Sequence, residues 1–328
     1  MDSNDLENII FNIRTDTEFN DIALEIFRFQ YNSNKIYRAF VDNLEKDYRS
    51  IDHFTQIPFL PVEFFKSHKV YACPNPPVKI FESSGTTGME TSKHHIADIS
   101  LYEKSFTLGF RQFYGSASDF VILALLPSYL ERGNSSLVFM IDRLISESGS
   151  GVSGFYLTHT EEMLEIVNHS DQNILLVGVS FALLDLAESG MIQSHHGRLT
   201  VMETGGMKGR RSEIVREELH QRLKKGLHTS SIHSEYGMTE LLSQAYSKGK
   251  GIFATPPWMK ILIRDTNDPL SLTETGKTGG INIIDLANLY SCSFIATKDL
   301  GKLHQNGTFE VSGRFDNSDI RGCNLLVE

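Results

Sequence analysis

From residue 78 onward, short apolar segments alternate with longer amphipathic ones, and this alternation limits the possible folds more than any other feature of the sequence. Short apolar runs bounded by turn residues predict strands, and apolar residues spaced three and four apart predict helices. Strands that alternate with helices favour an α/β fold with a largely parallel, helix-covered sheet. The predicted strands are 78–81, 120–126, 174–177, 199–202, 259–264 and 280–284, and the predicted helices are 100–114, 135–146, 160–169, 181–189 and 212–225.

The two ends of the chain differ from this alternating middle. Residues 1–75 are rich in aromatics at helical spacing, which predicts a helical N-terminal region packed on an α/β core at 76–328. Residues 245–312 are richer in Gly, Thr and Asp, which predicts a smaller β-rich antiparallel subdomain within that core. A short tail follows this subdomain.

Composition excludes several classes of function. The 328 residues carry a formal net charge of −10, which disfavours nonspecific binding to nucleic acids or acidic membranes. Only three cysteines are present, Cys73, Cys292 and Cys323, and their wide spacing fits a reducing cytoplasm better than a disulfide framework or a zinc site. The sequence contains no long apolar run, so we expect a cytoplasmic protein with no signal peptide and no membrane span.

One loop has the composition of a phosphate-binding site. It follows the predicted strand 78–81 and combines hydroxyl side chains with glycines. Glycines let successive backbone N–H groups converge on an anion, and the hydroxyls add donors to the same oxygens. The alternative is an ordinary flexible surface loop. The residues of the candidate loop are Ser83, Ser84, Gly85, Thr86, Thr87 and Gly88.

Further segments carry groups that suit a nucleotide. Gly205 and Gly206 follow a predicted strand and offer flat backbone to a planar ligand. In the segment 234–240, Tyr236 can stack on a base, Thr239 can reach a phosphate, and Glu240 can hold Mg²⁺ through a carboxylate oxygen.

Two charged residues near the C-terminus extend this series. Asp299 follows a probable strand, where it can accept hydrogen bonds from ribose hydroxyls, and Arg314 lies in the polar segment 313–322. Each residue alone also has an ordinary explanation: a core tyrosine for Tyr236, a turn acid for Asp299, and a surface ion pair for Arg314. The order of the segments along the chain carries the argument.

That order closely resembles the adenylate-forming superfamily, which includes acyl-CoA synthetases, adenylation domains of peptide synthetases and firefly-type luciferases. The resemblance covers about residues 81–322 and implies the fold of the large adenylating domain, with multilayer, largely parallel sheets and helices. The matching elements are the phosphate loop 83–88, the adenine-side glycine pair 205–206, the YGxTE motif at 236–240 with Gly237 as its glycine, a TGD-like element at 297–299 with Lys298 in place of the glycine, and a hinge-like motif at 313–316.

The same resemblance implies an acyl pocket. The segment 127–133 keeps the spacing of the family's proline, aromatic residue and glycine, with Tyr129 as the aromatic residue. Leu130 stands where the family often has histidine, which suggests a more apolar entrance. The strand and turn at 175–180 resemble one wall of the pocket, with Val179 and Ser180 at its end.

Two departures from the superfamily pattern are informative. The candidate for the family's phosphate-loop lysine is Lys93, which follows Gly88 by five residues, farther than is usual. The chain also ends six residues after Gly322, where a typical member continues into a mobile domain that carries a catalytic lysine. We therefore expect the large domain alone, lacking the usual C-terminal lysine-bearing domain.

In lacking this domain and its lysine, the chain resembles one branch, the LuxE-like acyl-protein synthetases. These are short adenylating enzymes with an acyl-accepting cysteine near the C-terminus, and Cys323 occupies a suitable position here. A thiolate attacks an acyl-adenylate readily and gives a transferable thioester, and the neighbouring Arg321 would lower the thiol pKa. The alternative is an ordinary cysteine in the tail.

The resemblance implies a two-step reaction with ATP and Mg²⁺. A carboxylic acid, expected to be a long-chain fatty acid, forms acyl-AMP with release of pyrophosphate, and the acyl group then passes to Cys323 and on to a partner protein. The partner would be a reductase, a transferase or an acyl carrier protein. Two alternatives remain: direct delivery to a carrier protein or coenzyme A, and a noncatalytic subunit that only binds nucleotide or acyl groups.

Overall fold

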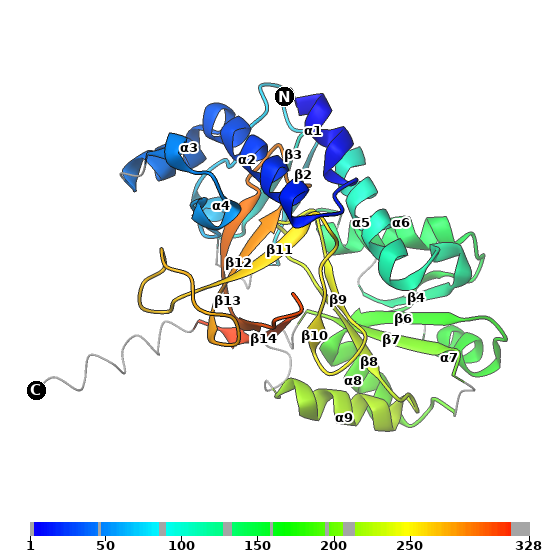
Figure 1. Cartoon of the computed structure of the whole chain (residues 1–328). Helices are drawn as coiled ribbons and strands as arrows, with labels where there is room; N and C mark the ends of the chain where they lie inside the picture. The colour runs from blue at the N-terminus through cyan, green and yellow to red at the C-terminus, as the bar shows by residue number, and fades with distance from the viewer. Residues whose placement is uncertain are drawn as a thin grey trace, which may run out of the picture. The chain divides into compact units, whose positions relative to one another are not determined.

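The computed structural model divides the chain into two compact units (Figure 1). The first unit comprises residues 1–77, 94–97 and 257–328, and the second comprises residues 78–93 and 98–256. The structure describes residues 3–44, 47–84, 90–126, 133–157, 160–193, 197–205 and 214–315.

The second unit is built around one mainly parallel sheet with the strand order β5-β4-β6-β7-β8-β9. The first five of these strands run parallel, and β9 pairs antiparallel with β8. The strands of the unit are β2 (Lys79–Glu82), β4 (Val121–Leu125), β5 (Gly154–Phe155), β6 (Ile174–Val179), β7 (Leu199–Thr204), β8 (Ile232–Tyr236), β9 (Ala245–Ser247) and β10 (Ile252–Phe253). Strand β3 (Lys93–Ile96) begins in this unit and crosses into the first.

Helices cover both faces of this parallel sheet (Figure 1). Helices α5 and α6 lie on one face, and α8 and α9 lie on the other. This explains why β4 and β6 are buried and apolar along their whole length. Gly178 lets these strands pack closely, because a Cβ at that position would lie 2.9 Å from Cβ of Leu125. The helices of the unit are α5 (Ile99–Tyr114), η3 (Ala117–Asp119), α6 (Ser136–Ser148), α7 (Thr160–His169), α8 (Ser180–Ser189) and α9 (Arg216–Gly226).

The strand order creates a topological switch point between β4 and β6. After β4 the chain moves outward to β5, and after β6 it moves in the opposite direction to β7 and β8. In doubly wound sheets, ligands bind outside the carboxyl ends of the strands at such a point. The fold therefore favours a ligand site beyond the ends of β4 and β6.

The first unit combines an antiparallel sheet with the N-terminal helices. Its strands follow the order β14-β13-β12-β11, and β1 pairs parallel with β13. The elements of the unit are α1 (Ser3–Ile10), α2 (Asp16–Ser33), α3 (Lys35–Asn43), η1 (Tyr48–Ser50), η2 (Phe54–Gln56), β1 (Leu60–Pro61), α4 (Phe64–Ser67), β11 (Met259–Arg264), β12 (Thr278–Asp285), β13 (Phe294–Leu303) and β14 (Phe309–Arg314).

Buried polar and aromatic contacts join the helices of the first unit to its sheet. The Gln30 amide on α2 donates to the carbonyls of Asn288 and Leu289, at 3.0 and 2.8 Å. On the same helix, the Phe27 ring packs edge-on against Phe294 of β13, with centroids 6.2 Å apart. A buried amide with all its partners fixes the docking of α2 more specifically than apolar contact alone.

The α/β fold expected from the sequence is confirmed, and every predicted strand and helix overlaps an observed element. Strand β8 was missed because its sequence, IHSEY, mixes polar and charged residues with apolar ones. The probable strand expected before Asp299 is observed as β13, which continues through Asp299 to Leu303. The compact units also group the chain differently from the sequence-based division at residue 75. They join the N-terminal helices to the C-terminal strands, which are far apart in the sequence.

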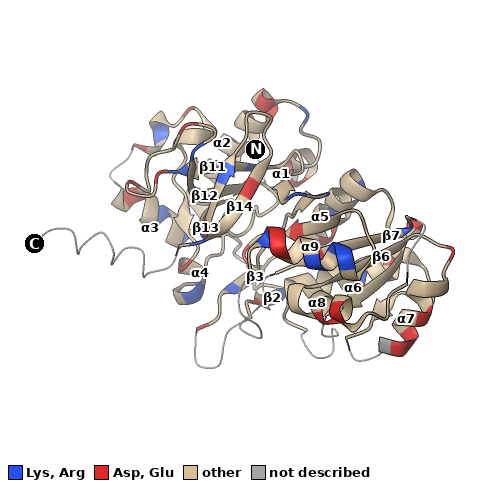
Figure 2. Cartoon of the chain, turned by 90° about the horizontal axis from the view of Figure 1, so that it is seen from below, with Lys and Arg blue, Asp and Glu red and all other residues tan. Residues whose placement is uncertain are grey.

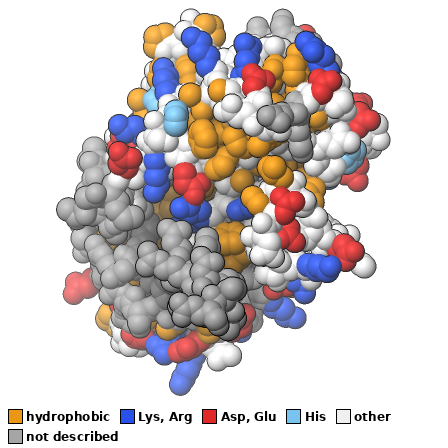
Figure 3. All heavy atoms as spheres, turned by 90° about the vertical axis from the view of Figure 1, so that its left-hand side faces the viewer, with side chains coloured by type: hydrophobic (Ala, Val, Ile, Leu, Met, Phe, Trp, Pro, Cys, Tyr) orange, Lys and Arg blue, Asp and Glu red, His pale blue; other side chains and the backbone are white. Residues whose placement is uncertain are grey.

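Charged side chains of both signs are distributed over the described elements. Helix α9 carries Glu217 and Glu218 in its first turn and Lys224 and Lys225 in its last, as the helix dipole favours (Figure 2). On the face drawn in Figure 3, acidic and basic side chains lie among hydrophobic ones. None of the helices in the described part of the chain is long and apolar enough to cross a membrane.

Candidate functional site

Several residues predicted to bind substrate lie at the carboxyl edge of the parallel sheet in the second unit. Ser180 begins α8 directly after β6, Gly205 follows β7, and Tyr236 ends β8 just before Gly237. Because β6, β7 and β8 are adjacent and parallel, these residues meet at one edge. This is the edge at which doubly wound sheets bind their ligands.

The candidate phosphate loop is closed at its base by two hydrogen bonds. The Ser83 backbone N–H donates to the Ser92 carbonyl at 3.1 Å, and the Ser92 N–H donates to Ser83 Oγ at 2.9 Å. Ser84 follows in the described chain, whereas Gly85, Thr86, Thr87 and Gly88 lie outside the described residues. Lys93 begins β3, and its side chain is exposed.

The segment after β8 leaves little space for a side chain at Gly237, because the Glu235 side chain lies close to it. A Cβ at this position would lie 2.5 Å from Oε1 of Glu235, so a residue with a side chain does not fit without a shift. Beside it, the Tyr236 ring packs against Phe253 with centroids 5.9 Å apart. The predicted base-stacking residue thus packs against the Phe253 ring.

Glu240 is the residue predicted to hold Mg²⁺, and its side chain is only 5% exposed. Thr239 beside it is partly exposed. Within the described ranges, no group of three His, Cys, Asp or Glu side chains lies close enough to hold a metal ion. A single carboxylate still fits Mg²⁺, which commonly takes one or two protein carboxylates and completes its shell with substrate phosphates and water.

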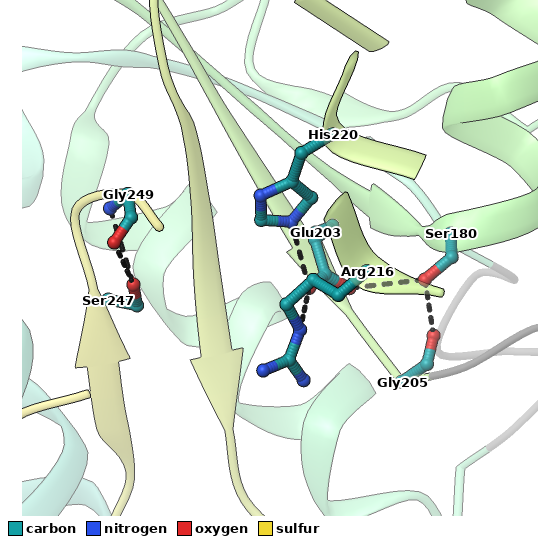
Figure 4. Close-up of polar contacts among 7 residues, drawn as sticks. All are labelled: Ser180, Glu203, Gly205, Arg216, His220, Ser247 and Gly249. Atoms are coloured by element: carbon teal, nitrogen blue, oxygen red, sulfur yellow. Dashed lines mark hydrogen bonds and ion pairs between the residues drawn. The ribbon is translucent and has the colours of Figure 1, made fainter. Parts of the chain in front are cut away.

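A second buried carboxylate, Glu203, lies near the end of β7 (Figure 4). The Ser180 hydroxyl contacts Glu203 Oε2 at 3.1 Å and the Gly205 carbonyl at 2.9 Å. From α9, His220 Nε2 and Arg216 Nε face Glu203 Oε1 at 3.6 and 3.9 Å. Figure 4 also draws the tight turn after β9, where Ser247 Oγ donates to the Gly249 carbonyl at 2.9 Å.

A third carboxylate, Glu235, lies on β8, next to β7. It faces the opposite side of the sheet from Glu203, because Glu203 lies beside Ser234 and Glu235 is the next residue along β8. The pKa of Glu235 is raised to about 7, because burial and the nearby charge of Glu203 raise it more than a hydrogen bond from Thr204 lowers it. Burial, followed by the Glu235 charge, also raises the pKa of the neighbouring Tyr114 phenol. Glu235 therefore titrates near neutral pH directly beneath Gly237.

In the first unit, Asp299 and Arg314 lie opposite each other on β13 and β14. Arg314 Nε donates to Asp299 Oδ1 at 3.1 Å, and the Asp299 backbone N–H donates to Thr297 Oγ1 at 3.0 Å. Lys298, which replaces the expected glycine, turns to the surface and pairs with Glu63 at 2.9 Å. The structure thus brings together two predicted nucleotide-binding residues that lie 15 positions apart.

Arg264 supports this region from within the sheet, and the sequence analysis missed it. Its guanidinium donates to the Ile281 carbonyl at 2.8 Å and to Asn282 Oδ1 at 2.9 Å, and lies 5.4 Å from the centre of the Phe315 ring. Gly280 leaves room for it, since a Cβ there would lie 2.5 Å from Arg264 Cζ. The paired glycines 279–280 in an otherwise apolar strand were the available signal.

The described cysteines differ in their surroundings. Cys292 is buried with its thiol directed at the Phe294 carbonyl at 3.3 Å, and burial raises its pKa to about 12. Cys73 is partly exposed, and both are free thiols. Cys323 lies outside the described residues, as do three other predicted site residues, Tyr129, Leu130 and Gly206.

Comparison with protein families identifies the chain. Residues 11–328 match the model of the LuxE acyl-protein synthetases. The chain belongs to the LuxE family. The resemblance seen in the sequence is therefore confirmed, and no curated protein sequence matches the chain significantly.

Structural comparison places this LuxE-family chain among adenylate-forming ligases in fold. ATP-bound MatB from Rhodopseudomonas palustris aligns with a TM-score of 0.55 and 18% identity over 72% of this chain and 47% of its own. A 2-hydroxyisobutyryl-CoA ligase in complex with 2-HIB-AMP and CoA aligns with a TM-score of 0.64 and 11% identity over 93% of this chain and 72% of its own.

A third structure is a long-chain-fatty-acid–CoA ligase from Archaeoglobus fulgidus, which aligns with a TM-score of 0.52 and 15% identity over 75% of this chain and 53% of its own. The chain spans about half the length of MatB. At these identities the structures establish the fold alone.

Proposed function

We propose that this protein activates a carboxylic acid with ATP and then transfers the acyl group to a protein thiol. The observation that carries the proposal is the LuxE family match over residues 11–328. The carboxyl edge of the parallel sheet supports it, because the residues there match the superfamily motifs in order. ATP in the MatB structure and an acyl-adenylate in the 2-hydroxyisobutyryl-CoA ligase structure are the ligands that this chemistry requires.

In the first step, a carboxylate oxygen attacks the α-phosphorus of ATP. A new oxygen–phosphorus bond forms, the bond to the β-phosphate bridging oxygen breaks, and pyrophosphate leaves with that electron pair. The nucleophile is already an anion, so no general base is required. The protein contributes mainly by positioning and by neutralising charge on the phosphates.

We assign each predicted site residue a role in this step. The loop 83–88 and Thr239 hold phosphate oxygens, with Lys93 as a further cation for the triphosphate. Tyr236 and the Gly205–Gly206 turn bind the adenine, and Asp299 with Arg314 binds the ribose. Glu240 would hold Mg²⁺, which supplies charge neutralisation at the phosphates when bound.

For the acyl group, we propose a long-chain fatty acid in a pocket formed by Tyr129, Leu130, Val179 and Ser180. Val179 is an apolar residue at the switch-point edge of the sheet. The Ser180 hydroxyl already contacts Glu203 and Gly205, so it has little capacity to recognise a polar substrate group. An apolar acyl chain fits this environment better than a polar acid.

In the second step, we propose that a thiolate attacks the acyl carbonyl carbon and AMP leaves with the bond electrons. Cys323 is the proposed acceptor, and a partner reductase, transferase or acyl carrier protein receives the acyl group from it. The buried Cys292 is a poor acceptor, because a thiol with a pKa of about 12 is almost entirely protonated at neutral pH. The two free thiols of the described chain fit a cytoplasmic protein.

Exchange of labelled pyrophosphate into ATP tests the activation step. We expect exchange that depends on a carboxylic acid and Mg²⁺, measured with saturated fatty acids of increasing length alongside aryl acids. Exchange supported best by short or aryl acids would contradict the fatty-acid assignment. ATP binding without exchange for any acid would favour a noncatalytic binding subunit.

A further inference from the structure

Glu203 links three separate elements at the carboxyl edge of the second unit. It is the penultimate residue of β7, its side chain is nearly buried, and its two oxygens face different partners (Figure 4). Oε2 faces the Ser180 hydroxyl at the start of α8, and Oε1 faces His220 and Arg216 on α9. A single carboxylate therefore connects β7 to both helices that cover this face of the sheet.

The surroundings of Glu203 favour its charged form. Burial raises the pKa of Glu203, but His220, Arg216 and the Ser234 hydroxyl together lower it below its usual value. A buried charge is stable only where polar and charged partners compensate for lost water. Arg216 is held in turn by the Phe253 ring, which its guanidinium approaches to 5.2 Å.

Ser180 connects this carboxylate to the turn that follows β7. Its hydroxyl lies 3.1 Å from Glu203 Oε2 and 2.9 Å from the carbonyl oxygen of Gly205. Gly205 adopts a φ of +59°, a left-handed conformation that glycine adopts without strain. Because one hydroxyl proton is shared between two acceptors, the position of the Glu203 carboxylate determines how Ser180 holds the Gly205 carbonyl.

We propose that Glu203 is a positioning residue for the nucleotide site, which acts through Ser180 to fix the Gly205 turn. This inference rests on the proposed function, in which that turn contacts the adenine. Glu203 itself does not touch the substrate in this role. His220 and Arg216 keep its charge in place from the opposite side.

A purely structural role would lower stability without changing the affinity for one substrate selectively. The test therefore compares Glu203→Gln and Ser180→Ala with Glu188→Gln, a matched control at an exposed carboxylate of α8 whose partner is Arg222. For each protein we would measure ATP affinity by calorimetry, KM for ATP and for the acid in pyrophosphate exchange, and the melting temperature.

We expect Glu203→Gln and Ser180→Ala each to weaken ATP binding roughly tenfold, as the loss of a charge-assisted hydrogen bond usually does. In Glu203→Gln, KM for the acid should stay within about twofold. The double variant should lose little more ATP affinity than either single variant, because both act on one contact. The control should retain wild-type affinity.

Unchanged ATP affinity in folded Ser180→Ala, or an equal loss for ATP and acid in Glu203→Gln, would overturn the positioning role. Ser180→Ala decides the matter if Glu203→Gln does not fold. The proposed function is judged separately, by whether the wild-type protein catalyses exchange. If the wild-type protein fails to bind ATP in the calorimeter, the positioning role falls as well.

Discussion

Arg314 Nε lies 3.1 Å from Oδ1 of Asp299, and the two residues face each other across β13 and β14. The Arg314 side chain is 77% exposed, whereas that of Asp299 is 9% exposed. The carboxylate is thus fixed inside the sheet, while its cationic partner lies on the surface. The Arg314 guanidinium thus lies beside the carboxylate that we propose binds the ribose.

The first prediction concerns this carboxylate. Asp299→Asn should weaken ATP binding by about 10–100-fold, since hydrogen bonds to a charged group contribute about 1.5–3 kcal/mol. The loss should be smaller for 2′-deoxy-ATP, which lacks one of the hydroxyls that the carboxylate would accept from. Calorimetric titration with both nucleotides measures the difference.

Glu310→Gln is a suitable control for Asp299→Asn, because Glu310 is a more exposed carboxylate on β14 that pairs with His304 at 2.8 Å. It should leave both affinities unchanged. Equal affinity of the wild-type and Asp299→Asn proteins for ATP would contradict the ribose-binding role and leave Asp299 only its ion pair with Arg314.

Glu240 gives the second prediction. Glu240→Gln keeps the size of this buried side chain but removes the negative charge that Mg²⁺ prefers. We expect the rate of pyrophosphate exchange to fall by about 100-fold or more, as is typical when a group that stabilises transition-state charge is lost. ATP affinity measured without Mg²⁺ should change little. Near-normal exchange at saturating Mg²⁺ would remove the metal assignment.

The third prediction concerns stability and Glu235. Its folded-state pKa of about 7 lies above the usual value of 4.5, so the folded state binds this proton more tightly than the unfolded state. The associated stability is fully present below pH 4.5 and is lost as the pH rises through 7. Glu235→Gln should therefore raise the melting temperature more at pH 8 than at pH 5.

Thermal melts of the wild-type and Glu235→Gln proteins across this range check the sign. The titratable groups that interact with Glu235 include Glu203, Tyr114 and Tyr246. Among them, the charge on Glu203 raises the pKa of Glu235, so Glu203→Gln should shift the transition to lower pH. A melting temperature that rises between pH 5 and pH 8 in both proteins would contradict the assignment.

The sequence predicted the parallel sheet well because buried strands such as β4 and β6 are apolar along their whole length. It missed β8, and it ended the strand before Asp299 too early, because these strands also carry the polar candidate site residues Tyr236 and Asp299. A strand that carries part of a site on its edge departs from the simple apolar pattern.

The sequence predicted single residues of the candidate site but not the contacts between them. Motif order identified Ser180 and Gly205 individually, but no local pattern shows that one hydroxyl contacts both Gly205 and Glu203, 25 and 23 positions away. Arg264 was missed because its partners on β12 and β13 are 17 to 33 positions away. Contacts of this kind depend on strand order, which periodicity does not determine.

The last prediction concerns the acyl acceptor. Incubation with ATP, Mg²⁺ and labelled fatty acid should leave hydroxylamine-sensitive label on the protein, and Cys323→Ser should abolish it while preserving pyrophosphate exchange, because adenylation precedes transfer. Cys73→Ser is the matched control, since Cys73 is a partly exposed free thiol, and it should retain the label. Cys292 should remain unlabelled in every variant, because burial keeps its thiol protonated. Label that persists in Cys323→Ser would assign the thioester elsewhere, and strong exchange with no label on the wild-type protein would favour direct delivery to a carrier protein or coenzyme A.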